Sequence, residues 1–247
     1  MPRVSVNILT KNRSQLLKQA LLSIEQQVFT DYEVVVVNDG STDNTAEVLK
    51  GSKVKNLKVI NHEKSLGITA SRQEALLASQ GEHVAVLDDD DEWLDTEKLA
   101  KQVKYLDEHQ ECVLLGGGIK IEPGVLVRFR PEADGKIRKT MLIRNNFFTS
   151  TVMFRREAAI SAGGFIEDGN DFAEDYDLWL RLGRLGKMCN FQEVFTLYRQ
   201  PNYNKEKFKA FLSKQLRLIA KHRGAYPGYW MARFLLKARL LILWLIK

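Results

Sequence analysis

Cysteine is scarce in this chain of 247 residues, because Cys112 and Cys189 are its only two and they lie far apart. Such a pair supports neither a disulfide framework nor a zinc site, and it suits a reducing compartment. The four histidines show no metal-ligand spacing, and we interpret them as surface or packing residues. They are His62, His83, His109 and His222.

Long apolar runs are also missing. In the C-terminal segment, the longest apolar run without a charge is Leu240–Ile246. It is far shorter than the roughly 20 residues that span a bilayer. The chain opens with Met1-Pro2-Arg3 and passes directly into a strand-like segment, without a leader pattern. These features predict a cytoplasmic protein.

Two glycine-rich phosphate-binding motifs are absent. No Gly-x-Gly-x-x-Gly follows the first predicted strand, and no Gly-x-x-x-x-Gly-Lys-Ser/Thr occurs anywhere. The sequence therefore lacks the fingerprints of dinucleotide-binding and P-loop proteins. No predicted helix follows the run Gly116-Gly117-Gly118, so we interpret it as a tight bend or a bulge of the backbone.

Charge is unevenly spread along the chain, whose net charge is +6. Residues 205–247 contain 11 Lys and Arg and one acidic residue, so residues 1–204 have a net charge of −4. A strongly basic tail favours an anionic partner, such as a membrane surface or a polyanion. Nucleic acid is not expected, because no stacking platform or recognition-helix pattern accompanies these charges.

The most informative feature is an apolar segment that ends in four aspartates. Val84–Leu87 has the length and composition of a buried strand, and Asp88–Asp91 follow it directly. Adjacent carboxylates repel one another, and Mg²⁺ or Mn²⁺ removes that repulsion and can be shared with a substrate phosphate. The pattern indicates a metal–phosphate site at the carboxyl end of a strand. A solvated acidic turn is the alternative.

Strands and helices alternate at short spacing before the aspartates. This alternation favours an α/β fold with a mostly parallel central sheet, which binds ligands where its strands end. Ser14 is the expected cap of the first helix, and Thr42 or Asp43 that of the next. The expected elements are strands Val4–Thr10, Tyr32–Val37, Leu57–Asn61 and Val84–Leu87, with helices Ser14–Gln27 and Thr69–Ser79.

The second half of the chain is less regular. A helix from about Phe172 to Leu182 carries Glu174, Asp175 and Asp177 in its first turn, which is more acid than capping requires. The other expected elements are helices Thr96–His109 and Arg155–Ala162, with strands Cys112–Gly116, Val125–Phe129, Thr149–Phe154 and Phe195–Tyr198.

Four segments, in this order and spacing, resemble the inverting GT-A glycosyltransferases of family 2. The resemblance extends from residue 3 to about residue 200 and implies a GT-A fold, the Rossmann-like fold of nucleotide-diphospho-sugar transferases. It also implies a nucleoside diphosphate sugar donor and a Mg²⁺ or Mn²⁺ cofactor. The segments are Val4-Ser5-Val6 with Thr10-Lys11-Asn12-Arg13, Val36-Val37-Asn38-Asp39-Gly40-Ser41-Thr42-Asp43, Leu87-Asp88-Asp89-Asp90-Asp91, and Glu174-Asp175-Tyr176-Asp177-Leu178-Trp179-Leu180-Arg181.

The resemblance implies roles in nucleotide binding. Thr10 and Asp39 would line the base pocket, with Asp39 accepting a hydrogen bond from a pyrimidine N–H. Arg72 would lie near the base and the phosphates. Asn12 and Asp89 complete the nucleotide-binding candidates.

The resemblance also implies roles at the reacting end of the donor. Asp88 and Asp90 match the Asp-x-Asp pair, with Asp88 near the ribose and Asp90 on the metal, and both are metal-site candidates. Asp91 could also contact the metal or its waters. Asp175 matches the catalytic base, and Glu174 lies beside it at the acceptor.

Several positions depart from the family pattern. Leu9 stands where proline is usual, and Lys11 stands where an aromatic residue often stacks on the base. Ser65-Leu66-Gly67 replaces the usual Asn-x-Gly, and Ala75 falls where glycine is common. These differences concern base and sugar recognition and leave the reaction class unchanged.

We therefore predict a metal-dependent, inverting glycosyltransferase of polysaccharide biosynthesis. It would move a sugar from a UDP-sugar, with dTDP and GDP as alternatives, to a hydroxyl of a lipid-linked or cell-surface glycan. Two alternatives remain. One is a different enzyme, a nucleotidyltransferase, and the other is a non-catalytic module that binds sugar nucleotides or glycans. The expected domains are a catalytic domain (1–204), with a nucleotide-binding half (1–115) and an acceptor half (116–204), and a basic amphipathic helical tail (205–247).

Two helices are predicted in the tail. The first, Lys205–His222, carries an apolar face that we expect to pack on the catalytic core. The second, from about Tyr226 to Ile246, interleaves basic residues with Trp and Leu, which suits a helix lying in a membrane interface. We expect residues 225–247 to contact the anionic inner face of the cell membrane, and a homodimer interface is the alternative.

Overall fold

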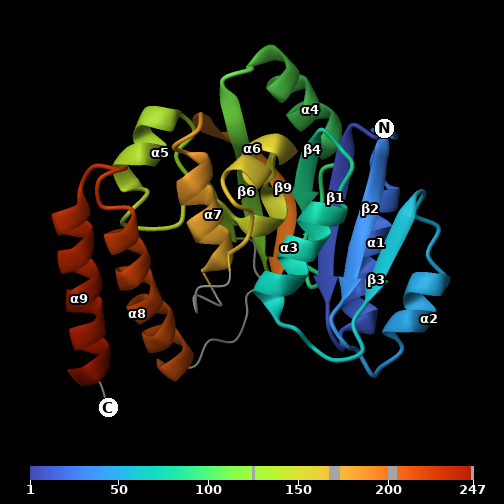
Figure 1. Cartoon of the computed structure of the whole chain (residues 1–247), viewed down its shortest axis with the longest axis horizontal. Coiled ribbons are helices and arrows are strands. Elements are labelled where there is room, and N and C mark those ends of the chain that lie inside the picture. The colour runs from blue at the N-terminus through green and yellow to red at the C-terminus, as the bar shows by residue number, and fades with distance from the viewer. Residues whose placement is uncertain (124–125, 167–172, 200–204, 246–247) are drawn as a thin grey trace.

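The computed structural model describes residues 1–123, 126–166, 173–199 and 205–245 (Figure 1). Within these ranges the strands are β1 (Val4–Thr10), β2 (Tyr32–Asn38), β3 (Leu57–Asn61), β4 (His83–Val86), β5 (Glu92–Trp93), β6 (Cys112–Glu122), β7 (Leu126–Arg128), β8 (Met153–Arg155) and β9 (Lys187–Arg199). The helices are α1 (Ser14–Glu25), α2 (Thr45–Lys50), α3 (Ile68–Ala78), α4 (Lys98–Glu108), α5 (Asp134–Thr140), the 3-10 turn η1 (Thr149–Thr151), α6 (Arg156–Ser161), α7 (Glu174–Leu182), α8 (Lys205–Lys221) and α9 (Tyr229–Leu245).

The strands of the described residues form one mixed sheet. Its order is β3-β2-β1-β4-β8-β6-β9-β5, and β7 pairs with β6 outside this path. The pairs β3–β2, β2–β1 and β1–β4 are parallel, so the carboxyl ends of these four strands lie along one edge. The strand β8 pairs antiparallel with β4 and β6, whereas β6 and β9 are parallel. The predicted α/β fold with C-terminal helices is confirmed.

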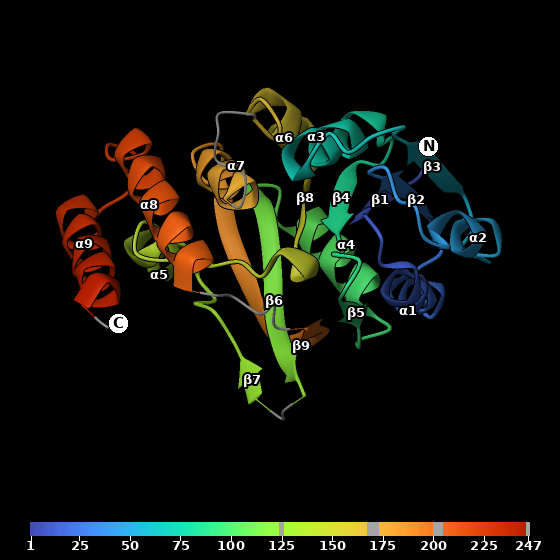
Figure 2. The same cartoon turned by 90° about the horizontal axis from the view of Figure 1, so that it is seen from below.

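Both faces of the sheet are covered by helices. Alternate residues of β4 divide between two apolar clusters, since Val84 and Val86 join one and Ala85 joins the other. The cluster of Ala85 includes side chains from α1, α2 and α4, and the cluster of Val84 includes side chains from α3, α5, α6 and α7. Figure 2 shows α3, α6 and α7 on one side of the sheet and α1 and α4 on the other. This burial on two faces explains why the strands read as continuous apolar runs.

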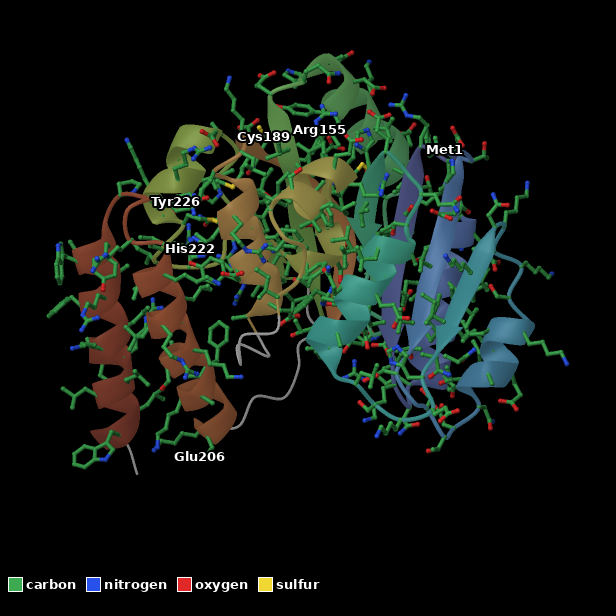
Figure 3. The ribbon with its side chains drawn as sticks, in the orientation of Figure 1. Met1, Arg155, Cys189, Glu206, His222 and Tyr226 are labelled. Atoms are coloured by element: carbon green, nitrogen blue, oxygen red, sulfur yellow. The ribbon has the colours of Figure 1, made fainter. Side chains whose placement is uncertain are left out.

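The tail packs against the apolar cluster that contains Val84. Leu212 and Leu236 are buried in it, and α8 and α9 lie side by side (Figure 1). Two hydrogen bonds fasten the tail to α7 near the side chains labelled in Figure 3: His222 Nε2 to Asp177 Oδ1 (3.0 Å) and Tyr226 OH to Leu180 O (2.8 Å). The expected packing of the first tail helix on the core is confirmed, and the division into two domains stays a prediction.

The glycine run lies inside a strand that is longer than expected. We predicted a strand that ends at Gly116, but β6 continues to Glu122, and its register with β9 shifts between Gly116 and Gly118. The predicted bulge is thereby confirmed. A Cβ atom at Gly117 would lie 2.3 Å from the Phe195 ring, so the strand passes too close to β9 for a side chain there.

Other predictions of local structure were wrong. The segment expected to be one strand over Thr149–Phe154 begins instead as η1, in which Thr151 N–H donates to Phe148 O (2.9 Å). Ser14 does not cap α1. The carboxylate of Asp43 accepts from Ser14 N–H (3.0 Å) and Thr45 N–H (3.1 Å), so it serves the starts of both α1 and α2. Parts of three predicted elements lie outside the described residues, at Val125, Phe172 and Ile246.

Candidate active site

A cleft of about 590 Å³ opens where β1, β2 and β4 end. Because these strands are parallel, the residues that follow them meet at one edge of the sheet. Six of the predicted nucleotide and metal residues line this cleft: Thr10, Asp39, Arg72, Asp88, Asp89 and Asp90.

Asn12 does not line the cleft. Its side-chain oxygen accepts a hydrogen bond from Thr42 N–H (2.7 Å), and its own N–H donates to Ser41 Oγ (2.9 Å). Asn12 therefore ties the loop after β1 to the loop after β2, and its backbone has a positive φ of 54°. Asn12 thus fixes two loops to each other, and its assignment to nucleotide binding stays a prediction.

Asp39 is held by four donors. Its Oδ1 accepts from Leu66 N–H (2.7 Å) and faces His62 Nδ1 (2.8 Å), and its Oδ2 accepts from Ser65 Oγ (2.5 Å) and Gly67 N–H (3.1 Å). Burial alone would raise the pKa of Asp39, but these hydrogen bonds outweigh it and keep the pKa below its usual value. A carboxylate offers about four acceptor sites, so a nucleobase N–H can reach Asp39 only where a partner such as the Ser65 hydroxyl turns away.

His62 contacts Asp39, a neighbour that the sequence analysis did not predict for it. Its ring lies between Asp39 and Glu74, with His62 Nε2 2.6 Å from Glu74 Oε2. Burial lowers the pKa of His62, and the two carboxylates raise it by more, so the net shift is upward. His62 directly follows β3, at the same edge of the sheet as Asp39, and that position was the available signal.

The four aspartates alternate between open and enclosed positions. The side chains of Asp88 and Asp90 are 32% and 26% exposed, whereas that of Asp89 is 6% exposed and Asp91 is fully buried. Arg13 Nη1 lies 2.9 Å from both Asp89 Oδ1 and Asp90 Oδ2. Both oxygens of Asp91 accept hydrogen bonds, from Ser150 Oγ and from Arg199 N–H. These hydrogen bonds fix the buried side chain of Asp91 in place. Burial and the charge of Asp88 raise the pKa of Asp91 to about 8.

Asp88 and Asp90 suit a divalent cation. Burial and the neighbouring charge of Asp88 raise the pKa of Asp90, and a bound cation would relieve this unfavourable environment. Mg²⁺ commonly takes one or two carboxylates and completes its shell with water and substrate phosphate, which matches two open aspartates in a cleft. Among the described residues, three possible ligand atoms lie within 4.8 Å of one another only at Glu82, His83 and Asp107. Arg3 already pairs with both of those carboxylates.

Two of the three acids of α7, Glu174 and Asp175, line a second cleft, of about 400 Å³. Asp175 Oδ2 accepts from Thr149 Oγ1 (2.5 Å), and Asp175 Oδ1 accepts from Tyr176 N–H (2.6 Å). Burial raises the pKa of Asp175, and Arg72 and Thr149 oppose that shift. Burial and the charge of Asp175 raise the pKa of Glu174 to about 7. The structure therefore offers a carboxylate with a fixed orientation and a high proton affinity.

Arg72 joins the two clefts. Its Nη2 lies 2.8 Å from Asp88 Oδ1 and its Nε lies 3.1 Å from Glu174 Oε1. Arg72 and Asp88 line both clefts, together with Ile68 and Tyr198. A buried guanidinium thus connects the nucleotide-side aspartates with the acids of α7, across residues that are far apart in the sequence.

Two other arginines, Arg199 at the first cleft and Arg155 away from both clefts, make structural contacts. Arg199 pairs with Glu92 and with Glu122 (2.8 Å) and donates to Asp90 O (2.9 Å). Arg155 donates to the backbone oxygens of residues 106 and 112 and lies near the end of the molecule that carries Met1 (Figure 3). Neither guanidinium is free to bind a phosphate group without losing these partners.

A family model described as glycosyl transferase family 2 matches residues 5–165. The chain belongs to this family. The matched residues include β1, the loop after β2, Arg72 and the four aspartates, and they end before α7. The family match therefore does not include Glu174 and Asp175. The roles predicted for these two residues of the family 2 glycosyltransferase rest on the sequence motif and on the geometry of the second cleft.

Similar proteins include other glycosyltransferases. The amylovoran biosynthesis glycosyltransferase AmsE of Erwinia amylovora is 28% identical over 248 residues, which is 93% of this chain and 91% of AmsE. An uncharacterized glycosyltransferase of Haemophilus influenzae is 28% identical over 216 residues, which is 80% of this chain. This family 2 glycosyltransferase spans only 65% of the length of the Haemophilus protein.

Solved structures show the same fold. The crystal structure of Staphylococcus aureus TarS with UDP-GlcNAc has a TM-score of 0.72 and 22% identity, and the match covers 98% of this chain and 72% of TarS 1–349. The mannosyltransferase PcManGT of Pyrobaculum calidifontis, solved with GDP-Man and Mn²⁺, has a TM-score of 0.71 and 20% identity over 97% of this chain and 70% of PcManGT. The predicted GT-A fold is confirmed by these matches.

Proposed function

We propose that this family 2 glycosyltransferase moves a sugar, with inversion, from a nucleoside diphosphate sugar to a hydroxyl of a lipid-linked or cell-surface glycan. The observation that carries the proposal is the meeting of two clefts at Arg72, which contacts Asp88 on one side and Glu174 on the other. One cleft ends in open carboxylates suited to a metal–diphosphate group, and the other contains an oriented carboxylate suited to an acceptor hydroxyl.

Similar proteins support this reading. TarS and PcManGT were solved with UDP-GlcNAc and with GDP-Man and Mn²⁺, and AmsE is named for amylovoran biosynthesis. UDP is our default nucleotide because Asp39 lies where the family motif places a pyrimidine contact. The choice of a lipid-linked or cell-surface glycan as the acceptor is also part of this proposal.

Each carboxylate has a distinct task in the proposed reaction. Asp88 and Asp90 would hold Mg²⁺ or Mn²⁺, which supplies Lewis-acid stabilisation of the departing diphosphate. Asp175 accepts the proton of the attacking hydroxyl, while Thr149 and the backbone of α7 fix its orientation. A single in-line displacement needs one such base and inverts the anomeric carbon.

A nucleotide panel tests the proposed function. With UDP and Mn²⁺ at about 100 times the Kd, ligand binding adds about 2.7 kcal/mol of stability, which raises the Tm of a chain of this size by about 5–10 °C. We expect UDP to exceed dTDP, GDP and CDP, and the shift to require Mn²⁺. Mn²⁺ alone and UMP with Mn²⁺ are the controls, measured by thermal shift. A folded protein that responds to none of the four diphosphates would contradict a nucleotide-sugar transferase.

We further propose that α9 binds the anionic inner face of the cell membrane. Trp230, Phe234 and Trp244 are 77%, 68% and 73% exposed, and exposed Lys237 and Arg239 lie on the same helix. Apolar and aromatic surface flanked by basic side chains suits a helix in the interface plane. No helix among the described residues has the length and apolar content to cross a bilayer.

Vesicle sedimentation tests this membrane contact. We expect the chain to bind phosphatidylglycerol vesicles and to bind pure phosphatidylcholine much less. Substitution of Trp230, Phe234 and Trp244 by Ser lowers the affinity about tenfold or more, because burial of only about 60 Å² of apolar surface is worth a factor of ten. Substitution of exposed Val28 and Leu185 by Ser is the matched control. Unchanged binding by the triple variant, or a stable homodimer through α9 in light scattering, would contradict the proposal.

A further inference from the structure

Two arginines line the second cleft, and a third lies near one of them. Arg128 and Arg130 line this cleft but not the first one, and Arg144 is close enough to Arg130 to lower its pKa. Within the described part of the chain, none of the three has a carboxylate at ion-pair distance, and the charges that act on Arg130 are those of the other two arginines. By contrast, Arg13 and Arg72 each contact two carboxylates.

The backbone directs this basic group toward the cleft. Arg128 ends β7, Arg130 follows two residues later, and both line the second cleft. Phe129, between them, packs against the bulge of β6, where its ring occupies the space that a side chain at Gly118 would need. The glycine bulge thus fixes the direction in which the two arginines point.

Arg130 is the most constrained of the three. Its guanidinium carbon lies 4.6 Å from the centroid of the Phe148 ring, and its buried Nε has no hydrogen-bond partner. Burial and the charges of Arg144 and Arg128 lower the pKa of Arg130 to about 10, so it remains a cation at neutral pH. A partly buried cation next to like charges is unfavourable unless an anion compensates it.

The basic group lies close to the proposed base. Phe148, on which Arg130 rests, precedes Thr149 in the chain, and Thr149 Oγ1 donates to Asp175 Oδ2. The same cleft of about 400 Å³ is lined by Arg130, Phe148, Thr149 and Asp175. An acceptor whose hydroxyl reaches Asp175 would therefore place a neighbouring substituent against the arginines.

We propose that the acceptor carries an oxyanion beside the hydroxyl that is glycosylated, and that Arg128, Arg130 and Arg144 bind this oxyanion. The group is a phosphoryl group or a carboxylate, since both accept paired hydrogen bonds from guanidinium. The inference rests on the proposed function and narrows the acceptor to an anionic glycan or an anionic lipid-linked saccharide. A neutral saccharide would leave the arginines unpaired.

Binding of small probes tests this inference in the full chain. With UDP and Mg²⁺ at saturation, so that the first cleft is filled, methyl phosphate, glucuronate and neutral methyl glucoside are titrated separately by ligand-observed NMR at constant ionic strength. We expect at least one anion to bind more tightly than methyl glucoside. Arg130→Gln should weaken that binding about 10- to 100-fold, the usual range for a hydrogen bond to a charged group.

Matched variants separate this role from a structural one. Arg128→Gln, at an exposed position, should also weaken anion binding, whereas Arg184→Gln, exposed and outside both clefts, should not. Preference for methyl phosphate identifies a phosphoryl acceptor, and preference for glucuronate identifies a carboxylate acceptor. Binding that is equal for all three probes, or insensitive to both cleft arginines, overturns the inference. UDP binding is recorded in the same samples, so its absence counts against the proposed function and its presence without anion binding counts against this inference alone.

Discussion

Replacement of Asp175 by Asn lowers the rate of sugar transfer by about 10²–10⁴-fold and leaves the binding of UDP with Mn²⁺ unchanged. The amide keeps the size of the side chain and can still contact Thr149 and the backbone of α7, but it cannot accept a proton at neutral pH. The measurement is the initial rate of transfer from a labelled UDP-sugar, together with the nucleotide-dependent thermal shift. Asp31→Asn, at an exposed position away from both clefts, is the control.

The pH dependence of the same reaction gives a second readout. A general base works only when it is deprotonated, and burial raises the pKa of Asp175 above its usual value. The rate of the unmodified chain therefore decreases as the pH falls through this raised pKa, and Asp175→Asn should lose that decrease. A variant that retains the full rate would mean that Asp175 is not the base. Loss of turnover with intact nucleotide binding would also exclude a non-catalytic binding module.

Asp90→Asn is expected to lower transfer by about 10²-fold or more and to make UDP binding independent of Mn²⁺. The reason is that a metal ion supplies several kcal/mol of stabilisation to the leaving group, and Asp90 is one of two open carboxylates suited to hold it. The measurement compares the thermal shift by UDP with and without Mn²⁺ in the variant and in the unmodified chain. Asp31→Asn again serves as the control.

Asp90 also pairs with Arg13, and a variant of Arg13 distinguishes metal binding by Asp90 from this ion pair. Arg13 lies 2.9 Å from the carboxylates of both Asp89 and Asp90, so the loss of Asp90 could act through Arg13. Arg13→Gln should preserve the Mn²⁺ dependence if Asp90 binds the metal. If Asp90→Asn keeps the full Mn²⁺-dependent shift, the assignment of Asp90 as a metal ligand is wrong.

The sequence predicted which residues meet at the first cleft because parallel strands place their carboxyl ends together. Thr10, Asp39 and Asp88 each follow or end a strand with a strong apolar pattern, and all three line one cleft. The same rule applied to His62 would have placed it beside Asp39, but a single histidine without ligand spacing gave no reason to look there. Local patterns thus located this half of the site.

The motif named Glu174 and Asp175, which line the second cleft, but the other residues of that cleft could not be predicted in the same way. Arg130, Phe148 and Thr149 come from segments with weak periodicity, and their contacts depend on the long pairing of β6 with β9. That pairing includes a glycine bulge, which removes the apolar alternation that marks a strand. The arginine group arises from tertiary structure, and one sequence has no local signal for it.

The position of Arg72 implies that the two substrates communicate through equilibrium binding. A ligand that withdraws Asp88 from this guanidinium strengthens the hold of Arg72 on Glu174 and changes the field at Asp175. We therefore expect occupancy of one cleft to alter affinity in the other, with the same coupling free energy in both directions. We therefore expect a single buried side chain in the shared wall to couple the binding of the proposed donor to that of the proposed acceptor.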